Sequence, residues 1–348
     1  FTISMDDKIS KQEGITSDFP FAKKVAKHLN LDLYNVHVGP EMADELEKMI
    51  YHLDEPQPDP ASLNVLFISR LAREYGIKVL LSGAGGDDIF SGYRRHRALM
   101  MERYWSYLPI SVRKVISLTT NRLPDSSPSF RRIAKAFRYA DLEGDSRIAS
   151  YFRWLDPKIV NSLLSTELRE ELKPMSFLEK SLDEIPQSVP PLNRMLYLEQ
   201  KHYLADHNLN YTDKMSMATG VEVRVPLLDP DLVKLAAQLP IQYKQNGKQG
   251  KWIFKKAMEG ILPNDVIYRP KTGFGVPIRG WVHGPLKILV RDILSESSIK
   301  KRGWFNSKAV TLLLNKDEIG KIDASYSIFA LLCIELWARI FLDRTNYK

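Results

Sequence analysis

One short stretch of the sequence combines the residue types needed to hold a phosphate group and its metal. The stretch "VLLSGAGGDDIFSGY" runs from an apolar segment into a glycine-rich turn that ends in two acids. Glycines let a backbone approach a ligand and direct N–H groups at an anion, and aspartates supply hard oxygens for Mg²⁺. Aspartates also cap helices, so the alternative interpretation is an ordinary turn between a strand and a helix. The residues concerned are Gly83, Gly85, Gly86, Asp87 and Asp88.

The common phosphate-binding loops do not explain this turn. The sequence contains neither the pattern G-x-x-x-x-G-K-[ST] nor a G-x-G-x-x-G that follows a strand. Open parallel sheets bind ligands beyond the C-terminal ends of their strands, and the turn after Leu81 follows such an end. We therefore expect a nucleotide site of another class at this place.

The elements around the turn predict an α/β protein with a parallel sheet flanked by helices. Strand-like patterns at 1–4, 33–38 and 77–81 alternate with helical periodicity, and we interpret the last of them, which is apolar except for Lys78, as an apolar strand of the sheet. Beyond Tyr93 helical patterns dominate. We predict an α/β part over residues 1–100 and a mainly helical part over 101–348, packed against the C-terminal edge of the sheet.

Composition narrows the class of protein. With 348 residues, 44% of them hydrophobic, the chain can bury a large core, and its 50 Lys and Arg against 42 Asp and Glu favour anionic partners. Cys333 is the single cysteine, which excludes an intrachain disulfide and suits a reducing cytoplasm. Glu335 and Arg339 interrupt the most apolar run, so we interpret it as a buried helix. We expect a cytoplasmic protein with no membrane partner.

Four ordered motifs make the sequence resemble a known family. They cover residues 51–56, 81–93, 213–229 and 262–278, and read "YHLDEP", "LSGAGGDDIFSGY", "DKMSMATGVEVRVPLLD" and "LPNDVIYRPKTGFGVPI". In this order they resemble the synthetase domain of the glutamine-dependent asparagine synthetases, over essentially the whole chain. The resemblance implies an ATP pyrophosphatase-type (adenine nucleotide alpha hydrolase-like) fold. It also implies a reaction in which ATP and Mg²⁺ adenylate a substrate carboxylate, aspartate or an analogue, before ammonia forms the amide.

The resemblance assigns roles to individual residues. Asp87 is similar to the family's aspartate ligand of Mg²⁺, and Lys271 to the lysine that stabilises charge on the phosphate and the acyl intermediate. Arg269 and Asp88 are placed with Lys271 as catalytic residues. The residues placed at the nucleotide are Ile3, Ser82, Gly83, Gly85, Asp213 and Arg224. For Arg224 a salt bridge within "GVEVRVP" is an equally good interpretation.

The sequence departs from the family pattern in three ways. Ala84 stands where the family usually has a glutamate that handles substrate or ammonia, which puts aspartate as the acceptor in doubt. Asp88 and Ser91 replace a more usual glutamate and glycine. The pyrophosphate loop S-G-G-x-D-S, expected one helix before residues 1–4, does not occur in the sequence, and neither does the glutaminase domain with its N-terminal cysteine. We expect this chain alone to bind ATP weakly, with ammonia supplied by a glutaminase domain or partner.

Three other readings remain open. Ala84 favours an enzyme of the same superfamily that acts on another carboxylate, such as a sugar acid or a β-amino acid that closes to a lactam. A non-catalytic binding protein that keeps the fold is the second. The third is nucleic-acid binding through basic segments at 93–105 and 130–140, but a solvated helix face explains these charges more simply, so we predict no nucleic-acid partner. The oligomeric state stays open, with a homodimer as one option. The basic residues that cluster in the segment 130–140 are Arg131, Arg132, Lys135 and Arg138.

Overall fold

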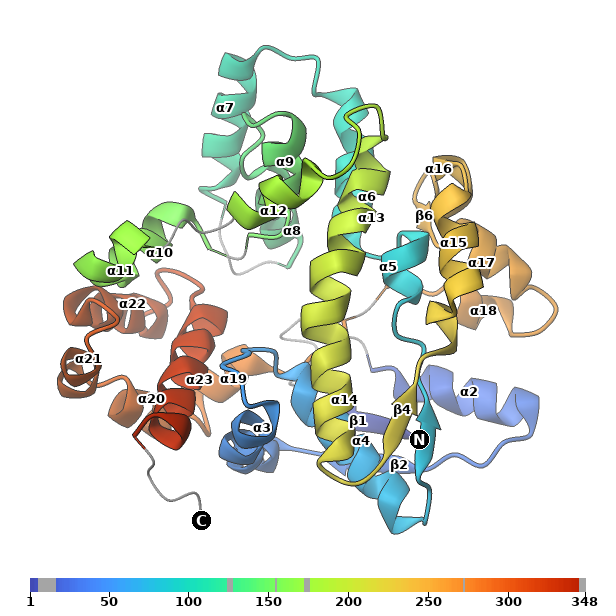
Figure 1. The fold of residues 1–348 in the computed structure, drawn as a ribbon, viewed down its shortest axis with the longest axis horizontal. Coiled ribbons are helices and arrows are strands. Elements are labelled where there is room, and N and C mark those ends of the chain that lie inside the picture. Colours follow the sequence, from blue (N-terminus) through green and yellow to red (C-terminus); the bar gives the residue numbers. More distant parts are fainter. Residues whose placement is uncertain (6–16, 124–127, 154, 172–175, 272, 344–348) are drawn as a thin grey trace.

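The computed structural model describes residues 1–5, 17–123, 128–153, 155–171, 176–271 and 273–343. Its described residues form a mainly helical protein with two small parallel sheets and one antiparallel pair (Figure 1). This confirms a mixed α/β protein in which helices dominate after residue 93. The strands form separate pairs in place of the single sheet that the alternating pattern predicts.

The first parallel pair contains β1 (Thr2–Met5) and β2 (Asn35–Val38), with Ile3 opposite Val36. Between them in the sequence lies α2 (Phe19–Leu29), which ends where Asn30 adopts a left-handed backbone conformation. Because Ile3 packs against the main hydrophobic core, β1 is anchored from one side by apolar burial.

The second parallel pair joins distant parts of the chain. β3 (Val79–Leu81) pairs with β4 (Glu222–Arg224), a strand that the sequence analysis did not predict. The structure has a strand at Val79–Leu81 within the predicted range, but its apolar side chains are largely exposed, with Val79 at 41% and Leu81 at 73%. Among the described residues β3 has β4 as its one strand neighbour, so its other edge makes no strand pairing there.

The main core lies under the C-terminal helices and the helices that follow β2. Its central members come from α3 (Leu46–Leu53), α4 (Ala61–Glu74), α14 (Asn210–Met217), α19 (Ile278–His283) and α23 (Ser325–Phe341). α23 is the most apolar run of the sequence, and its Glu335 binds the Arg302 guanidinium at 3.0 and 3.1 Å. The prediction of a buried helix is therefore confirmed. Within the described residues, no helix combines the length and apolarity needed to cross a bilayer.

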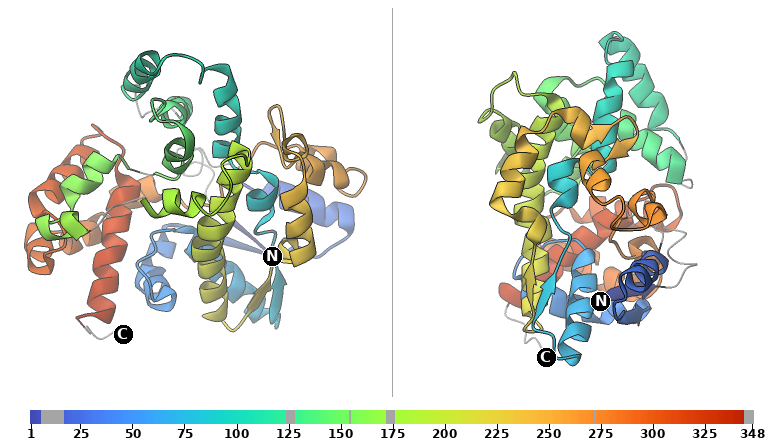
Figure 2. Two further views of the ribbon diagram at one scale, coloured as in Figure 1. Left: turned by 45° about the horizontal axis from the view of Figure 1, so that its top comes forward. Right: turned by 90° about the vertical axis from the view of Figure 1, so that its right-hand side faces the viewer.

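A continuous helical rod runs through the middle of the molecule, from α13 (Pro191–Leu198) through η3 (Glu199–Leu209) into α14 (Figures 1 and 2). The middle segment has π-helical hydrogen bonding, which often marks functional sites. Close to it lie α5 (Gly86–Phe90) and α6 (Arg94–Met101), the two elements that follow β3. The rod thus forms the support against which the glycine turn is held.

The remaining elements complete the helical part. In the middle of the chain they are η2 (Glu102–Tyr104), α7 (Ile110–Thr120), α8 (Pro128–Phe137), α9 (Gly144–Ser150), α10 (Pro157–Leu163), α11 (Thr166–Glu171) and α12 (Ser176–Leu182), after an early η1 (Pro40–Glu45). Beyond β4 they are η4 (Pro226–Leu228), α15 (Pro230–Gln238), α16 (Ile241–Lys244), the pair β5 (Gln245–Asn246) and β6 (Gln249–Gly250), α17 (Trp252–Ala257), α18 (Asn264–Ile267), α20 (Lys287–Ile293), α21 (Glu296–Arg302) and α22 (Ser307–Glu318).

Candidate active site

The glycine turn lies between the end of β3 and the start of α5. The Ser82 N–H donates to the Arg224 carbonyl at 2.8 Å, and the Ala84 N–H donates to Ser82 Oγ at 3.2 Å. Gly85 adopts φ 86°, and a Cβ there would lie 2.3 Å from a methyl of Leu228. A Cβ on Gly83 would meet nothing within 4 Å. Gly85 is therefore required by close packing, whereas Gly83 borders open space into which a ligand can come.

Two lysines converge on Asp87 at this turn. The Lys251 ammonium lies 2.8 Å from Asp87 Oδ1, and Lys271 forms an ion pair with Oδ2 although 184 residues separate it from Asp87. The Asp87 side chain is 17% exposed. Burial alone would raise the pKa of Asp87, but the charges of Lys271 and Lys251 outweigh it and lower the pKa to about 2. Asp87 is thus ionised at neutral pH.

The capping interpretation of the two aspartates does not hold for α5. Gly85 is the N-cap residue, and no side chain caps the helix. Asp87 pairs with the two lysines, and Asp88 is buried against the Tyr93 hydroxyl. Electrostatic pairing and burial therefore decide where these carboxylates point.

Lys251 is the site residue that sequence reasoning missed. It has a left-handed backbone conformation at φ 53°, and its N–H donates to the Phe90 carbonyl at 3.0 Å. A Cβ on the preceding Gly250 would lie 2.1 Å from the Ser91 oxygen, so the β5–β6 hairpin packs tightly on the end of α5. The local signal is a turn, "NGKQGK", and nothing in it indicates that the lysine meets an aspartate 164 positions earlier.

Asp88 lies behind the turn in a buried polar network. The Tyr93 hydroxyl lies 3.3 Å from each Asp88 oxygen, and Asn208 Nδ2 donates to the Tyr93 hydroxyl at 3.1 Å. Burial, with the negative charges of Glu199 and Asp87 beside it, raises the pKa of Asp88 to about 7. The described contacts link Asp88 to Tyr93 and connect it to Lys271 only through the Tyr93 ring, 5.6 Å from the Lys271 ammonium.

A buried ion cluster supports Tyr93 from the side of η3. Arg95 makes two hydrogen bonds of 2.5 Å to the Glu199 carboxylate, and His96 Nε2 lies 2.9 Å from the same group. The Arg95 guanidinium also lies 4.4 Å from the centroid of the Tyr93 ring and 4.5 Å from that of Tyr203. The π-helical segment therefore presents Glu199, Tyr203 and Asn208 to one neighbourhood around α6.

The side chains of the other predicted site residues make their contacts away from Asp87. Arg269 binds Asp18 at 2.5 Å, and its guanidinium lies over the Phe21 ring. The Lys271 carbonyl, two residues further along the chain, accepts a hydrogen bond from Arg94 at 2.8 Å. Arg224 is exposed and pairs with Glu222 at 2.8 Å, which is the salt bridge that the sequence left as an alternative. Asp213 is exposed on α14, and Ile3 lies in β1. None of the contacts described by the structure joins these four side chains to Asp87 or Lys271.

Metal binding at the turn depends on the ligand set available. No group of three or more His, Cys, Asp and Glu that could hold a metal ion occurs in the part of the chain that the structure describes. Mg²⁺ is commonly held by one or two carboxylates together with substrate phosphates and water. Asp87 with open space beside Gly83 fits that arrangement, in which the nucleotide brings most of the ligands.

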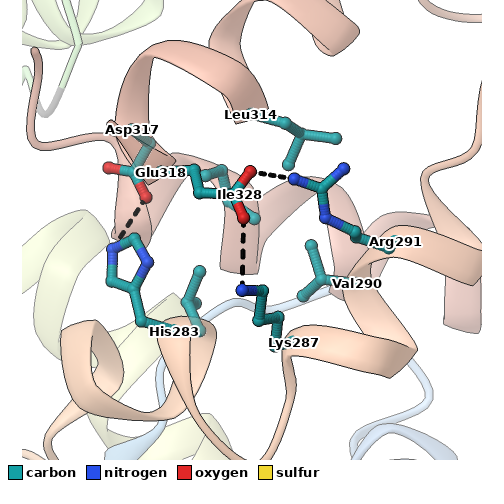
Figure 3. Close-up of a pocket in the computed structure, with 9 residues that line it drawn as sticks. His283, Lys287, Val290, Arg291, Leu314, Asp317, Glu318 and Ile328 are labelled. Carbon is teal, nitrogen blue, oxygen red and sulfur yellow. Dashed lines mark hydrogen bonds and ion pairs between the residues drawn. The ribbon is translucent and has the colours of Figure 1, made fainter. Parts of the chain in front are cut away.

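A separate cavity of about 30 Å³ lies between α19, α20, α22 and α23 (Figure 3). His283 lies 3.1 Å from Asp317, Lys287 lies 3.2 Å from Glu318, and Arg291 pairs with the same glutamate. The polar and charged side chains that line this cavity thus pair with one another. None of the glycine-turn residues lines it, so the cavity is not an extension of the site at Asp87.

The geometry defines an α/β protein with two lysines and an aspartate at the C-terminal end of a parallel strand, where these side chains suit a phosphate group. Comparison with known proteins identifies the family within this class. The asparagine synthase family model matches residues 1–339, so the chain belongs to the asparagine synthase family.

Curated relatives agree with the family match. Asparagine synthetase [glutamine-hydrolyzing] 1 of Bacillus subtilis is 28% identical over 96% of this chain and 51% of its own length. A putative asparagine synthetase [glutamine-hydrolyzing] of Mycobacterium tuberculosis is 28% identical over 93% of this chain and 47% of its own. Amidase chyE of Penicillium rubens is 22% identical over 91% and 49%. The chain therefore spans about half the length of these relatives.

Proposed function

We propose that this chain is the synthetase part of an ATP-dependent amide-forming ligase with an ATP pyrophosphatase-type fold. The observation that carries the proposal is the convergence of Lys251 and Lys271 on Asp87 at the end of β3. Crevices at such strand ends are where α/β sheets bind nucleotides. Family membership supports the same reaction class.

Asp87 and the two lysines have complementary roles in this proposal. Mg²⁺, held by Asp87 and the phosphates, would neutralise the triphosphate during carboxylate attack. The lysine ammoniums are compact charges on flexible stems, so they can move from Asp87 to phosphate oxygens when the nucleotide binds. Lys271 then stabilises the negative charge that develops as the substrate carboxylate attacks the α-phosphorus and pyrophosphate leaves. Ammonia attacks the activated carbonyl carbon in the second step and releases AMP.

The carboxylate substrate is aspartate or an analogue, and Ala84 bears on the choice. Ala84 brings no carboxylate to the turn, and Asp88 is buried against Tyr93, so it does not replace one. This observation favours the second candidate, a related enzyme acting on another carboxylate. Ammonia comes from a glutaminase domain or partner in either case.

The exposed face of β3 supports a further part of the proposal. Leu81 is 73% exposed although parallel strands of α/β proteins are normally covered on both faces. We propose that additional polypeptide, including the pyrophosphate loop, covers this strand in the working enzyme. The 348 residues alone should then bind ATP weakly.

The test is pyrophosphate release by the polypeptide that the whole gene encodes. Release should require ATP, Mg²⁺ and one carboxylate from a panel of aspartate, sugar acids and β-amino acids, because adenylation needs that nucleophile. Asp87→Asn should abolish release, whereas Asp231→Asn, a change at an exposed aspartate on α15, should leave it intact. ATP binding without release for any carboxylate would instead favour a non-catalytic binding protein.

A second variant separates binding from chemistry. Lys271→Met should lower turnover at least 100-fold while weakening ATP binding about 10-fold or less, since its charge matters most as the transition state develops. Binding is measured by calorimetry and turnover by pyrophosphate release. Equal losses in both would mean that Lys271 contributes only ground-state affinity.

A further inference from the structure

Helix α7 has an inverted distribution of polar and apolar side chains. It buries Arg113 and Ser117, and Arg113 donates to the Leu108 and Ala140 carbonyls at 3.0 and 3.1 Å and pairs with Glu143. Four of its five aliphatic side chains are exposed, with exposed fractions of 52%, 42%, 59% and 54% for Ile110, Val112, Val115 and Leu118. A helix that packs on its own core normally does the reverse.

Two aromatic residues extend this exposed surface. Tyr104 is 61% and Tyr107 77% exposed, just before α7 begins. Figure 1 places α7 at the outer edge of the molecule, at the top of the view, and the β1–β2 pair near the bottom. Monomeric proteins rarely leave contiguous apolar surface in water unless it meets a partner.

The same segment carries nearly all of the protein's excess positive charge. Residues 103–140 contain eight Lys and Arg and one Asp, a net charge of +7 out of +8 for the whole chain. Arg103, Lys114 and Arg122 are exposed on or beside α7. Outside this segment acidic and basic residues nearly balance. Within it Arg113 is buried and pairs with Glu143, so the positive charge at the surface comes from the other basic side chains.

We propose that the exposed face of α7, with Tyr104 and Tyr107, binds peripherally to a bilayer that contains anionic lipids. Aliphatic side chains would enter the boundary between headgroups and acyl chains, tyrosines would lie at headgroup level, and the surrounding cations would meet anionic headgroups. This goes beyond the proposed ligase activity. It also departs from the sequence-based expectation of no membrane partner, which rested on the absence of a spanning segment.

Charge and side-chain type together favour this occupant over others. If this face bound a second copy of the chain, two segments of net charge +7 would face each other, and like-charge repulsion opposes that association. A nucleic acid is bound through phosphate contacts and gains little from four exposed aliphatic side chains. A lipid surface uses both the apolar and the cationic component of this face.

The experiment is flotation of the chain with vesicles of phosphatidylcholine alone or with 30% phosphatidylglycerol. We expect binding to the anionic vesicles that weakens as salt is added. Lys114→Gln with Arg122→Gln should reduce partitioning about 25-fold, which is about five-fold for each basic side chain. Val115→Gln with Leu118→Gln should reduce it about 10-fold. Ile288→Gln, at an 84% exposed position on α20, is the matched control and should change nothing.

Three results would overturn the proposal. The first is failure to bind anionic vesicles at low salt, and the second is binding that both double variants leave unchanged. The third is binding to soluble polyglutamate as tight as to vesicles, with no effect of the Val115 and Leu118 changes, which would indicate an acidic protein partner. Because all four changed side chains are exposed, unaltered circular dichroism and melting temperature will show that the variants fold.

Discussion

Lys251 Nζ lies 2.8 Å from Asp87 Oδ1, while Lys271 pairs with the other oxygen of the same carboxylate. One buried anion therefore holds two cations, and the group carries a net charge of about +1 at the end of β3. Such a cluster attracts anions, and a carboxylate shared between two ammoniums keeps both of them positioned before a phosphate arrives.

Lys251→Met should weaken ATP binding roughly 10- to 100-fold, since a hydrogen bond to a charged group contributes about 1.5–3 kcal/mol. The matched control is Lys248→Met, a change in the same hairpin at an exposed lysine. Calorimetry on the complete gene product with Mg²⁺ and ATP measures both. Equal affinities for the two variants would show that Lys251 only neutralises Asp87.

Gly92→Ala should disturb the Asp87 carboxylate without touching either lysine. A Cβ at position 92 would lie 1.7 Å from Asp87 Oδ1 and 2.8 Å from its Cα, so the carboxylate must move. We expect a loss of about 1–3 kcal/mol in unfolding free energy, together with weaker ATP binding.

Gly83→Ala is the companion to that change. Because its Cβ would meet nothing within 4 Å, stability should stay within about 0.5 kcal/mol of wild type. ATP affinity should fall nevertheless if the nucleotide lies against this turn. Urea unfolding and calorimetry distinguish the two effects, and unchanged affinity would remove Gly83 from the site.

Glu199→Gln should be strongly destabilising. The Glu199 side chain is fully buried and binds both Arg95 and His96, so its loss leaves the largely buried Arg95 guanidinium, 20% exposed, without its counter-charge. A cost of about 3–5 kcal/mol in unfolding free energy is expected. Glu222→Gln breaks the exposed pair with Arg224 and should have no measurable effect on the urea midpoint. Similar midpoints for the two variants would contradict the role of burial.

The His207–Asp59 pair makes stability depend on pH. Burial alone would lower the pKa of His207, but Asp59, 3.0 Å away, raises it above its ordinary value. Protonated His207 therefore stabilises the fold. This contribution is complete below the unfolded-state pKa of about 6.5 and is lost as pH rises through the higher folded-state pKa.

Asp59→Asn should remove that pH dependence. Asp59 Oδ1 accepts the Ala61 N–H at 2.8 Å, and an asparagine oxygen can keep this bond while the negative charge disappears. Urea unfolding from pH 5.5 to 8.5 should show wild type losing stability with rising pH relative to the variant. Parallel curves would mean that His207 does not titrate between the two states.

Local patterns were enough to predict several parts of this protein. The apolar run with Cys333, Glu335 and Arg339 could be predicted as a buried helix because the features that indicate one, its length and its two charges, lie within consecutive residues. The glycine turn was recognisable for the same reason, since strand, glycines and aspartates are adjacent in the chain. Four ordered motifs sufficed to indicate the family.

Only the tertiary structure decided which distant residues meet. It paired β3 with β4, brought Lys251 to Asp87, turned Asp88 toward Tyr93 and gave Arg269 to Asp18. Each of these outcomes depends on loop closure and on competition among many charged groups for a few partners, and sequence spacing carries no record of that competition. Residue type and periodicity determine which elements form and which of their faces are apolar. The packing of the whole chain determines which charged side chains form ion pairs with one another.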